Sequence, residues 1–410
     1  MSEQLGQPPW MTAPATKAVL DALEAAGGAD CARFVGGVVR NAIIGQPIAD
    51  IDVATTLTPE AVTKALRDGG VRAVPTGFEH GTVTAVYKGQ PIEVTTLRRD
   101  VETDGRRAVV AFTTDWREDA ERRDFTLNSL YAARDGTIFD PTGQGVADAR
   151  AGRIVFVGDP QLRLREDHLR SLRFFRFLAW YGRGEPDAAA IAAITALKDQ
   201  VATLAAERIS AELLKLLAAE DPREAVRLMH QTGVLSVILP GRLDLARFEA
   251  LTALEQALGE RVALLRLAAL LPDDPAEGVR TAERLRLSNA DRDRLATALA
   301  PGPQLAPGLA PQAARAMIYR SSAQAFRDRA KLNWAAAGGA DAAGWRGLLA
   351  IGEAWTSPSL PVTGADVVAA GAPKGPKVGQ ALRALEAWWI EGDFTADRAQ
   401  ALAKLEELMT

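Results

Sequence analysis

Short apolar runs and long amphipathic stretches occupy different parts of the chain. Strands are predicted where apolar residues cluster or alternate, over residues 32–35, 51–54, 82–87, 92–97 and 109–113. A helix is predicted over 58–66, because Thr58 can cap its first turn and Pro59 suits the first helical position. From about Leu162 the apolar spacing is helical to the C-terminus. The pattern therefore predicts an α/β N-terminal part, ending near the turn-rich residues 139–143, and an all-helical remainder.

Composition narrows the class of protein. Of the 410 residues, 48% are hydrophobic and 24% charged, as expected for a folded chain of several domains. The single cysteine, Cys31, excludes an intrachain disulfide and fits a reducing cytosol. We find no secretory signal at the N-terminus and no apolar run long enough for a bilayer. We therefore expect a cytoplasmic protein without a membrane partner. Its net charge of -4 gives no overall attraction to nucleic acid, so any nucleic-acid binding would depend on local basic patches.

The most informative segment joins a double glycine to two carboxylates. Gly36 and Gly37 follow an apolar run, and Arg40 comes one helical turn later. Glycine lets the backbone approach a phosphate chain, and the amides that open a helix bind anions. On a strand, Asp50 and Asp52 would point to one face, where a divalent cation such as Mg2+ would relieve their repulsion. Each piece also occurs in ordinary turns, but together they predict a nucleoside triphosphate site.

Other charged positions could complete this site. Glu93 lies in an alternating strand and could face the two aspartates across the sheet, although the pattern alone favours a solvated position. Arg122 and Arg123, which we place at the start of a helix, could clamp a triphosphate or ribose; the alternative is a solvent-facing helix start with a local ion pair. Carboxylates that hold two Mg2+ ions would activate a 3'-hydroxyl and neutralise pyrophosphate in nucleotidyl transfer.

A further charged stripe lies on a helix predicted over residues 165–176. Asp167 and Arg170 share a face three residues apart, and Arg173 and Arg176 continue it. Such a face is ordinarily only solvated, but four aligned groups favour a binding surface. A carboxylate accepts from an exocyclic amino group and a guanidinium donates to ring acceptors. The first two residues could therefore select cytosine and adenine and reject uracil and guanine.

In their order along the chain, these motifs resemble those of the class II CCA-adding tRNA nucleotidyltransferases, an order that the bacterial poly(A) polymerases share. The motifs span residues 33–217: Gly-Gly-x-x-Arg with Asp-x-Asp, Arg-Arg-Asp-Phe-Thr, Glu-Asp-x-x-Arg and the segment 207–213. The resemblance implies an α+β fold. Its expected parts are a nucleotidyltransferase head of mixed or antiparallel sheet with helices over 1–143, a nucleobase-reading helical neck over 144–218, a helical body over 219–300 and a helical, tRNA-binding tail over 301–410.

The resemblance also implies roles for individual residues. Residues 207 and 208 are expected to steady the neck helices, and residues 98–107 to form a polar, mobile loop. The remaining roles are Mg2+ binding at Asp50 and Asp52, a further catalytic carboxylate at Glu93, triphosphate contacts at Gly36, Gly37, Arg40, Arg122 and Arg123, base selection by Asp167 and Arg170, and nucleotide contacts at Arg173 and Arg176.

The C-terminal part adds a weaker indication of RNA binding. Lys374 and Lys377 flank a glycine-rich turn before a helix, which suits contacts with phosphates, although exposed lysines in a helix hairpin explain them equally well. Trp388 and Trp389 are predicted to be core residues of the tail.

The expected activity is template-independent addition or repair of the 3'-terminal CCA of tRNA from CTP and ATP. Expected partners are tRNA and these nucleotides, with no obligate protein partner. The alternatives are a poly(A) polymerase or a partial enzyme that adds only C or only A. A catalytically idle RNA-binding protein on the same scaffold is a third possibility, against which the retained carboxylates argue.

Overall fold

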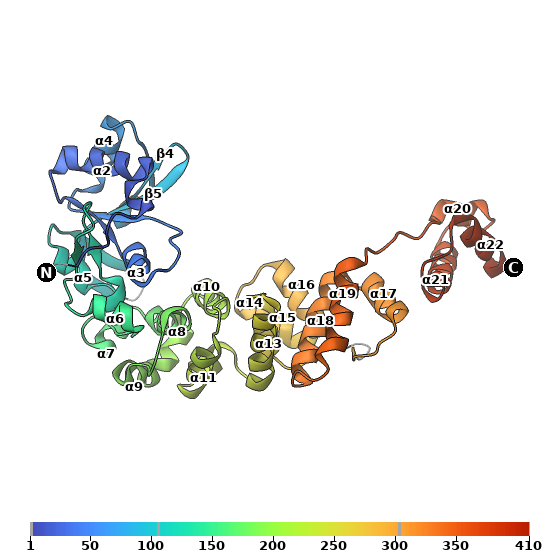
Figure 1. Cartoon of the computed structure of the whole chain (residues 1–410). Coiled ribbons are helices and arrows are strands. Elements are labelled where there is room, and N and C mark those ends of the chain that lie inside the picture. Colours follow the sequence, from blue (N-terminus) through green and yellow to red (C-terminus); the bar gives the residue numbers. More distant parts are fainter. Residues whose placement is uncertain (1–2, 105–106, 302–304, 410) are drawn as a thin grey trace. The chain divides into compact units, whose positions relative to one another are not determined.

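The computed structural model describes residues 3–104, 107–301 and 305–409. They form two compact units, Met1–Gly241 and Arg242–Thr410. The strands of the described residues lie in the first unit, and the second unit is helical, as the ribbon in Figure 1 shows. The α+β fold class is confirmed. The finer division into head, neck, body and tail stays a prediction.

A seven-stranded mixed sheet lies in the first unit. Its strands are β1 (Ala32–Val35), β2 (Asp52–Thr55), β3 (Arg72–Gly77), β4 (Thr82–Tyr87), β5 (Gln90–Thr96), β8 (Tyr131–Ala132) and β9 (Ile138–Phe139). Their order is β3-β4-β5-β2-β1-β8-β9. Within this sheet, β2 and β5 pair in parallel and the other neighbours pair antiparallel.

Helices surround this sheet and continue beyond it along the first unit. Helices α2 and α4 pack on the strands β4 and β5. The helices are α1 (Pro9–Thr12), α2 (Pro14–Gly27), α3 (Gly37–Ile44), α4 (Pro59–Asp68), α5 (Trp116–Glu121), α6 (Gly145–Ala151), α7 (Pro160–Glu166), α8 (Leu169–Tyr181), α9 (Ala188–Leu197), α10 (Ala206–Leu217), α11 (Arg223–Gln231) and α12 (Val234–Ile238), with 3-10 turns η1 (Phe78–His80), η2 (Thr126–Asn128) and η3 (Lys198–Thr203).

The pairing register separates an apolar face of the sheet from a polar one. Val53 pairs with Val94, which also pairs with Val83, and all three side chains are buried on the side of α2 and α4. Asp52 pairs with Glu93 in the same register. Because side chains alternate along a strand, both carboxylates point to the opposite face of the sheet. The apolar core thus determines where the acids lie, since a slip of one residue would exchange the two faces.

Four strands occur where the sequence indicated none, namely β3, β6 and the two-residue strands β8 and β9. Residues expected to form a polar loop form β6 (Arg98–Asp104), which pairs with β7 (Arg107–Phe112) in a second sheet. Residues 105–106 of the expected loop lie outside the described residues. Strand β3 was missed because it contains Pro75 and few apolar residues, and proline is tolerated there since β3 is an edge strand.

Two helices end where the sequence predicted a start or a continuation. Arg122 is the C-cap of α5, so the Arg122/Arg123 pair follows a helix and does not open one. Between α7 and α8 the backbone of Asp167 is extended, with φ of -151° and ψ of 105°, and its Oδ1 accepts from the N–H of Leu169 at 3.0 Å. The predicted continuous helix over 165–176 is wrong, because α7 ends at Glu166, α8 begins at Leu169, and Asp167 lies between them.

The second unit contains helices α13 to α22 and two separate apolar clusters. One cluster includes Leu305, Phe326 and Trp345. The helices are α13 (Leu245–Leu258), α14 (Ala263–Leu270), α15 (Pro275–Arg284), α16 (Asn289–Ala298), α17 (Pro311–Arg320), α18 (Ala323–Ala336), α19 (Ala342–Ala354), α20 (Gly364–Ala369), α21 (Pro376–Glu391) and α22 (Arg398–Met409).

The second cluster joins the last three helices. Val367, Leu385 and Leu405 are fully buried there, and Trp388 packs against them. Trp389 is buried as well, so the prediction that both tryptophans belong to the core is confirmed. The two lysines at positions 374 and 377 are exposed at the start of α21.

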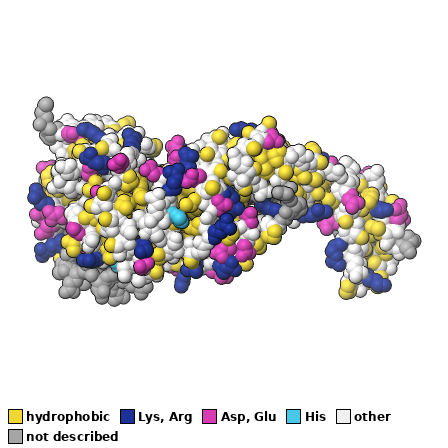
Figure 2. Space-filling view, turned by 90° about the horizontal axis from the view of Figure 1, so that it is seen from below, with side chains coloured by type: hydrophobic (Ala, Val, Ile, Leu, Met, Phe, Trp, Pro, Cys, Tyr) yellow, Lys and Arg dark blue, Asp and Glu magenta, His cyan; other side chains and the backbone are white. Residues whose placement is uncertain are grey.

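Charged side chains are mixed on the surface. On the face shown in Figure 2, small groups of Lys and Arg alternate with Asp and Glu, and no field of one sign covers it. This distribution agrees with the small net charge of -4. In the described part of the chain, no helix combines the length and apolar character that crossing a bilayer requires.

Candidate active site

Acids on adjacent strands form one side of the site. Asp52 is half-buried at the start of β2, Glu93 is exposed beside it on β5, and Asp50 is exposed just before β2. Burial and the negative charges of Glu93 and Asp50 raise the pKa of Asp52 to about 6. Converging negative charge of this kind is offset by a hard divalent cation, so the donor set fits Mg2+. Within the described ranges, no group of three or more acidic, histidine or cysteine side chains is arranged to hold a metal.

The double glycine forms the turn between β1 and α3. Gly36 caps α3 with φ of 69°, in the left-handed region that glycine adopts without strain. Arg40, on the first turn of α3, is buried and donates to Oδ1 of Asn128 at 2.5 Å and to the hydroxyl of Tyr181 at 2.8 Å. Its guanidinium also lies 3.9 Å from the centroid of the Tyr181 ring. These contacts hold the start of α3 against the neighbouring elements.

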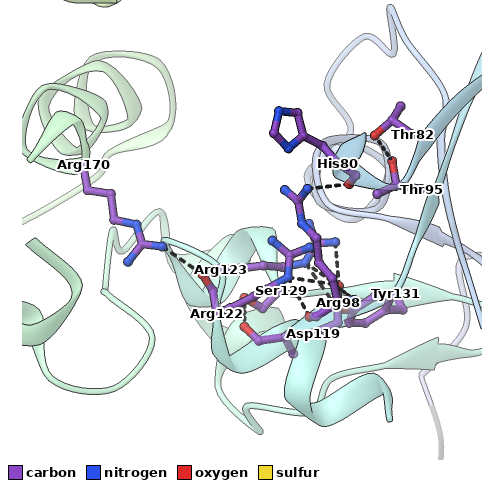
Figure 3. A network of polar contacts seen from close by, with 11 residues as sticks. His80, Thr82, Thr95, Arg98, Asp119, Arg122, Arg123, Ser129, Tyr131 and Arg170 are labelled. Atoms are coloured by element: carbon purple, nitrogen blue, oxygen red, sulfur yellow. Dashed lines mark hydrogen bonds and ion pairs between the residues drawn. The ribbon is translucent and has the colours of Figure 1, made fainter. Parts of the chain in front are cut away.

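Arg122 and Arg123 line the same cavity as Asp52 and Glu93 and share one buried carboxylate. Arg122 Nη2 is 2.6 Å from Oδ1 of Asp119, and Arg123 Nη2 is 2.9 Å from Oδ2. The hydroxyl of Tyr131 donates to the same Oδ2 at 2.6 Å. Figure 3 shows these side chains converging, with the side chain of Arg98 close by.

One cavity of about 420 Å³ brings the two charged sides together. A cavity lined by both carboxylates and guanidiniums can hold a phosphate chain through a cation and through direct charge-assisted hydrogen bonds. Asp50 does not line this cavity itself. The predicted residues that do are Gly36, Gly37, Arg40, Asp52, Glu93, Arg122, Arg123 and Arg173.

A neighbouring cavity of about 270 Å³ contains the residues predicted to read the base. Asp167 and Arg170 both line it, although they do not pair with each other. Oδ2 of Asp167 accepts from Arg208 Nη2 at 2.8 Å, whereas Arg170 donates to Oε2 of Glu166 at 2.5 Å and to the main-chain oxygen of Arg122 at 2.9 Å. Arg122 and Arg123 line both cavities, so this last contact lies where the smaller cavity meets the larger one.

The two remaining arginines of the predicted stripe, Arg173 and Arg176, lie in different surroundings. Arg173 lines both cavities and donates through Nε to Oδ2 of Asp124 at 2.7 Å. Burial alone would raise the pKa of Asp124, but the charge of Arg173 holds this pKa below its usual value. Arg176 lines neither cavity and donates to Oε2 of Glu212 at 2.6 Å. The structure therefore places Arg173 in the site and Arg176 against α10.

Several lining or supporting residues were not singled out in the sequence. Asp119 could have been found, because it stands three and four residues before the arginine pair on a helix, where such side chains meet. Asn128 and Phe177 carry no comparable local signal. Arg208 was assigned only to steadying helices, and the structure adds its bond to Asp167.

Comparisons with known proteins agree with this geometry. The model of the Poly A polymerase head domain matches residues 32–155, and that of the probable RNA and SrmB-binding site of polymerase A matches residues 185–244. Mouse mitochondrial CCA tRNA nucleotidyltransferase 1 is 32% identical over 388 residues, which cover 92% of this chain and 86% of that protein. The chain belongs to the CCA tRNA nucleotidyltransferase family.

Other members of the CCA tRNA nucleotidyltransferase family match to different extents. The human mitochondrial protein of the same name is 41% identical over 224 residues, which are 53% of this chain and 51% of that protein. The crystal structure of the Bacillus stearothermophilus CCA-adding enzyme in complex with CTP has a TM-score of 0.77 at 28% identity, and the match covers 97% of this chain and 98% of that one. The family resemblance seen in the motifs is thus confirmed.

Proposed function

We propose that this chain adds or repairs the 3'-terminal CCA of tRNA, using CTP and ATP and releasing pyrophosphate. The observation that carries the proposal is the cavity that Asp52, Glu93, Arg122 and Arg123 line together, next to a cavity that Asp167 and Arg170 line. The first provides for a triphosphate and the second for a base. The mouse relative carries the same activity in its name, and the Bacillus stearothermophilus relative was crystallised with CTP.

The chain's own residues supply binding and positioning for the reaction. Arg122 and Arg123 bind the triphosphate and stabilise the charge that develops on the departing pyrophosphate. The amides after Gly36, at the start of α3, suit a further phosphate contact. Asp50 and Asp52 hold Mg2+, with Glu93 beside them. When bound there, Mg2+ would supply the positive charge that lowers the pKa of the attacking 3'-hydroxyl and polarises the α-phosphate.

Asp167 and Arg170 select the base of the incoming nucleotide. Cytosine and adenine present an amino group to a carboxylate and ring acceptors to a guanidinium, whereas uracil and guanine would present a carbonyl oxygen to the carboxylate. The contact of Asp167 with Arg208 directs this carboxylate. Selection then needs no nucleic-acid template.

The test of the function is single-nucleotide incorporation. The purified chain is incubated with tRNA that lacks its CCA end, or only the final A, together with one nucleoside triphosphate at a time. We expect two C additions from CTP to the first tRNA and one A addition from ATP to the second. Unlimited A addition would favour a poly(A) polymerase. Addition of only C or only A would favour a partial enzyme. If no pyrophosphate were released with any RNA, the chain would be an idle RNA-binding protein.

The metal is a separate prediction. Because Asp52 meets the charges of Glu93 and Asp50, removing divalent cations with a chelator should leave these acids without a counter-charge and lower incorporation by at least about 100-fold. Added Mg2+ should restore the rate. A control at the same chelator concentration with excess Mg2+ excludes an effect of the chelator. Full activity in chelator alone would contradict the metal site.

Two further assignments complete the proposal. Lys374 and Lys377 contact tRNA phosphates from the exposed start of α21, which their charge and position support. We place the chain in the cytoplasm on the basis of its single cysteine, whereas the mouse and human relatives are mitochondrial by name.

A further inference from the structure

We propose that Asp119 is a positioning residue whose one buried carboxylate directs both guanidiniums that face the triphosphate, an inference that rests on the function proposed above. Its Oδ1 accepts from Nε and Nη2 of Arg122 at 3.0 and 2.6 Å. Its Oδ2 accepts from Nε and Nη2 of Arg123 at 3.2 and 2.9 Å. Each carboxylate oxygen thus takes one guanidinium (Figure 3).

Burial keeps Asp119 away from substrate and makes its charge effective. The residue is 1% exposed, so it cannot touch a nucleotide, and charge interactions are stronger in such surroundings. Burial alone would raise the pKa of Asp119, but the charges of Arg123 and Arg122 hold this pKa well below its usual range. The carboxylate is therefore ionised at neutral pH. The side chains of Arg122 and Arg123 are 15% and 20% exposed, and both line the larger cavity.

Two more contacts connect this carboxylate to the two sheets. Tyr131 on β8 donates its hydroxyl to Oδ2 at 2.6 Å, and the N–H of Arg98, the first residue of β6, donates to Oδ1 at 3.2 Å. Arg122 Nε in turn donates to the carbonyl oxygen of Arg98 at 2.9 Å. A guanidinium that is already held in this way loses little freedom when it binds a phosphate. Loss of the carboxylate should therefore appear in nucleotide and pyrophosphate binding.

Asp148 offers a matched control for a purely structural effect. It is a similarly buried carboxylate in the same unit, 3% exposed, and accepts from the hydroxyl of Thr126 at 2.6 Å and from Arg153 Nε at 2.8 Å. It lines neither the triphosphate cavity nor the nucleobase cavity. Asp148→Asn thus weakens a buried ion pair without altering the arginines of the site.

The experiment compares full-length wild type, Asp119→Asn, Tyr131→Phe and Asp148→Asn in CMP addition to tRNA that lacks its CCA end. KM is measured separately for CTP and for tRNA. The inhibition constant of inorganic pyrophosphate and the melting temperature are measured for each protein as well. For Asp119→Asn we expect KM for CTP and the pyrophosphate constant to rise about tenfold or more, with KM for tRNA unchanged. Tyr131→Phe, which keeps the charge, should raise both by about two- to fivefold. Asp148→Asn should lower the melting temperature only.

The outcomes separate this inference from the function on which it rests. Unchanged constants in folded Asp119→Asn, or an equal rise in Asp148→Asn, overturn the positioning role. If Asp119→Asn does not fold, Tyr131→Phe decides, and unchanged constants in that variant overturn it. If wild type adds no nucleotide to tRNA, the proposed function fails, and direct binding of pyrophosphate to wild type and variants still tests how the arginines are positioned.

Discussion

Replacing Asp52 by asparagine is expected to lower nucleotide incorporation by at least about a thousandfold, the largest effect of any single change considered for this chain. Asparagine keeps the shape of the side chain and removes its charge, so the proposed metal loses one of two anionic ligands. The side chain lies at the start of β2, where the pairing of Val53 with Val94 continues the ladder. We therefore expect the fold to persist. Initial rates with CTP and with ATP measure the loss.

Asp68→Asn is the matched control for Asp52→Asn. Asp68 lies at the end of α4 in the same unit, is exposed and pairs with Lys64 four residues earlier. Exposed pairs of this kind contribute less than about 1 kcal/mol to stability, so this variant should retain the wild-type rate. Binding of tRNA, followed by mobility shift, should be unchanged in both proteins. An Asp52→Asn protein with full activity would exclude the metal assignment.

Asp167→Ala is expected to change which nucleotides are added more than how fast they are added. A paired set of hydrogen bonds to a base edge is worth about 10- to 100-fold in discrimination, so the preference for CTP over UTP should fall by that factor. Removing the carboxylate eliminates the acceptor for the amino group and the repulsion against a carbonyl oxygen. The ratio of kcat/KM values for CTP and UTP measures the change.

The control for Asp167→Ala must account for the hydrogen bond to the N–H of Leu169, at the start of α8, that this variant also loses. Asp187 caps α9 by accepting from the N–H groups of Ala189 and Ala190, and it lines neither cavity of the site. Asp187→Ala should lower stability by about 1 kcal/mol, as loss of a cap does, and leave the nucleotide ratio unchanged. Unaltered selectivity in Asp167→Ala would show that base choice resides elsewhere.

The pattern of apolar and polar residues predicted those elements whose structure depends mainly on residues close together in the chain. The strands β1 and β4 were predicted over their observed residues, and α4 begins after Thr58, whose hydroxyl oxygen accepts from the N–H of Ala61. The pattern failed where pairing partners decide the structure. Strand β6 is rich in charged residues and is stabilised by its ladder with β7, so its own sequence gave no sign of a strand.

The site was predictable in its chemistry and less so in its geometry. The spacing of Asp50 and Asp52 indicated a cation site, and the register of β2 with β5 places Glu93 beside Asp52. No local rule could assign Arg208 to Asp167, because the two residues are 41 positions apart and meet only through the packing of helices. The break at Asp167 was missed for a different reason, since helical spacing of apolar residues continues across it while the backbone turns.

The parallel pairing of β2 with β5 has a consequence for how the protein becomes active during folding. The chain between these strands contains α4, β3 and β4, so Asp52 and Glu93 become neighbours only when this long segment closes into the sheet. Such a non-local pairing forms late, because the chain entropy of closing the loop is lost before the contacts are gained. A nascent chain that ends before β5 therefore carries the two aspartates without their third acid, and acquires the complete set only when the sheet closes in register.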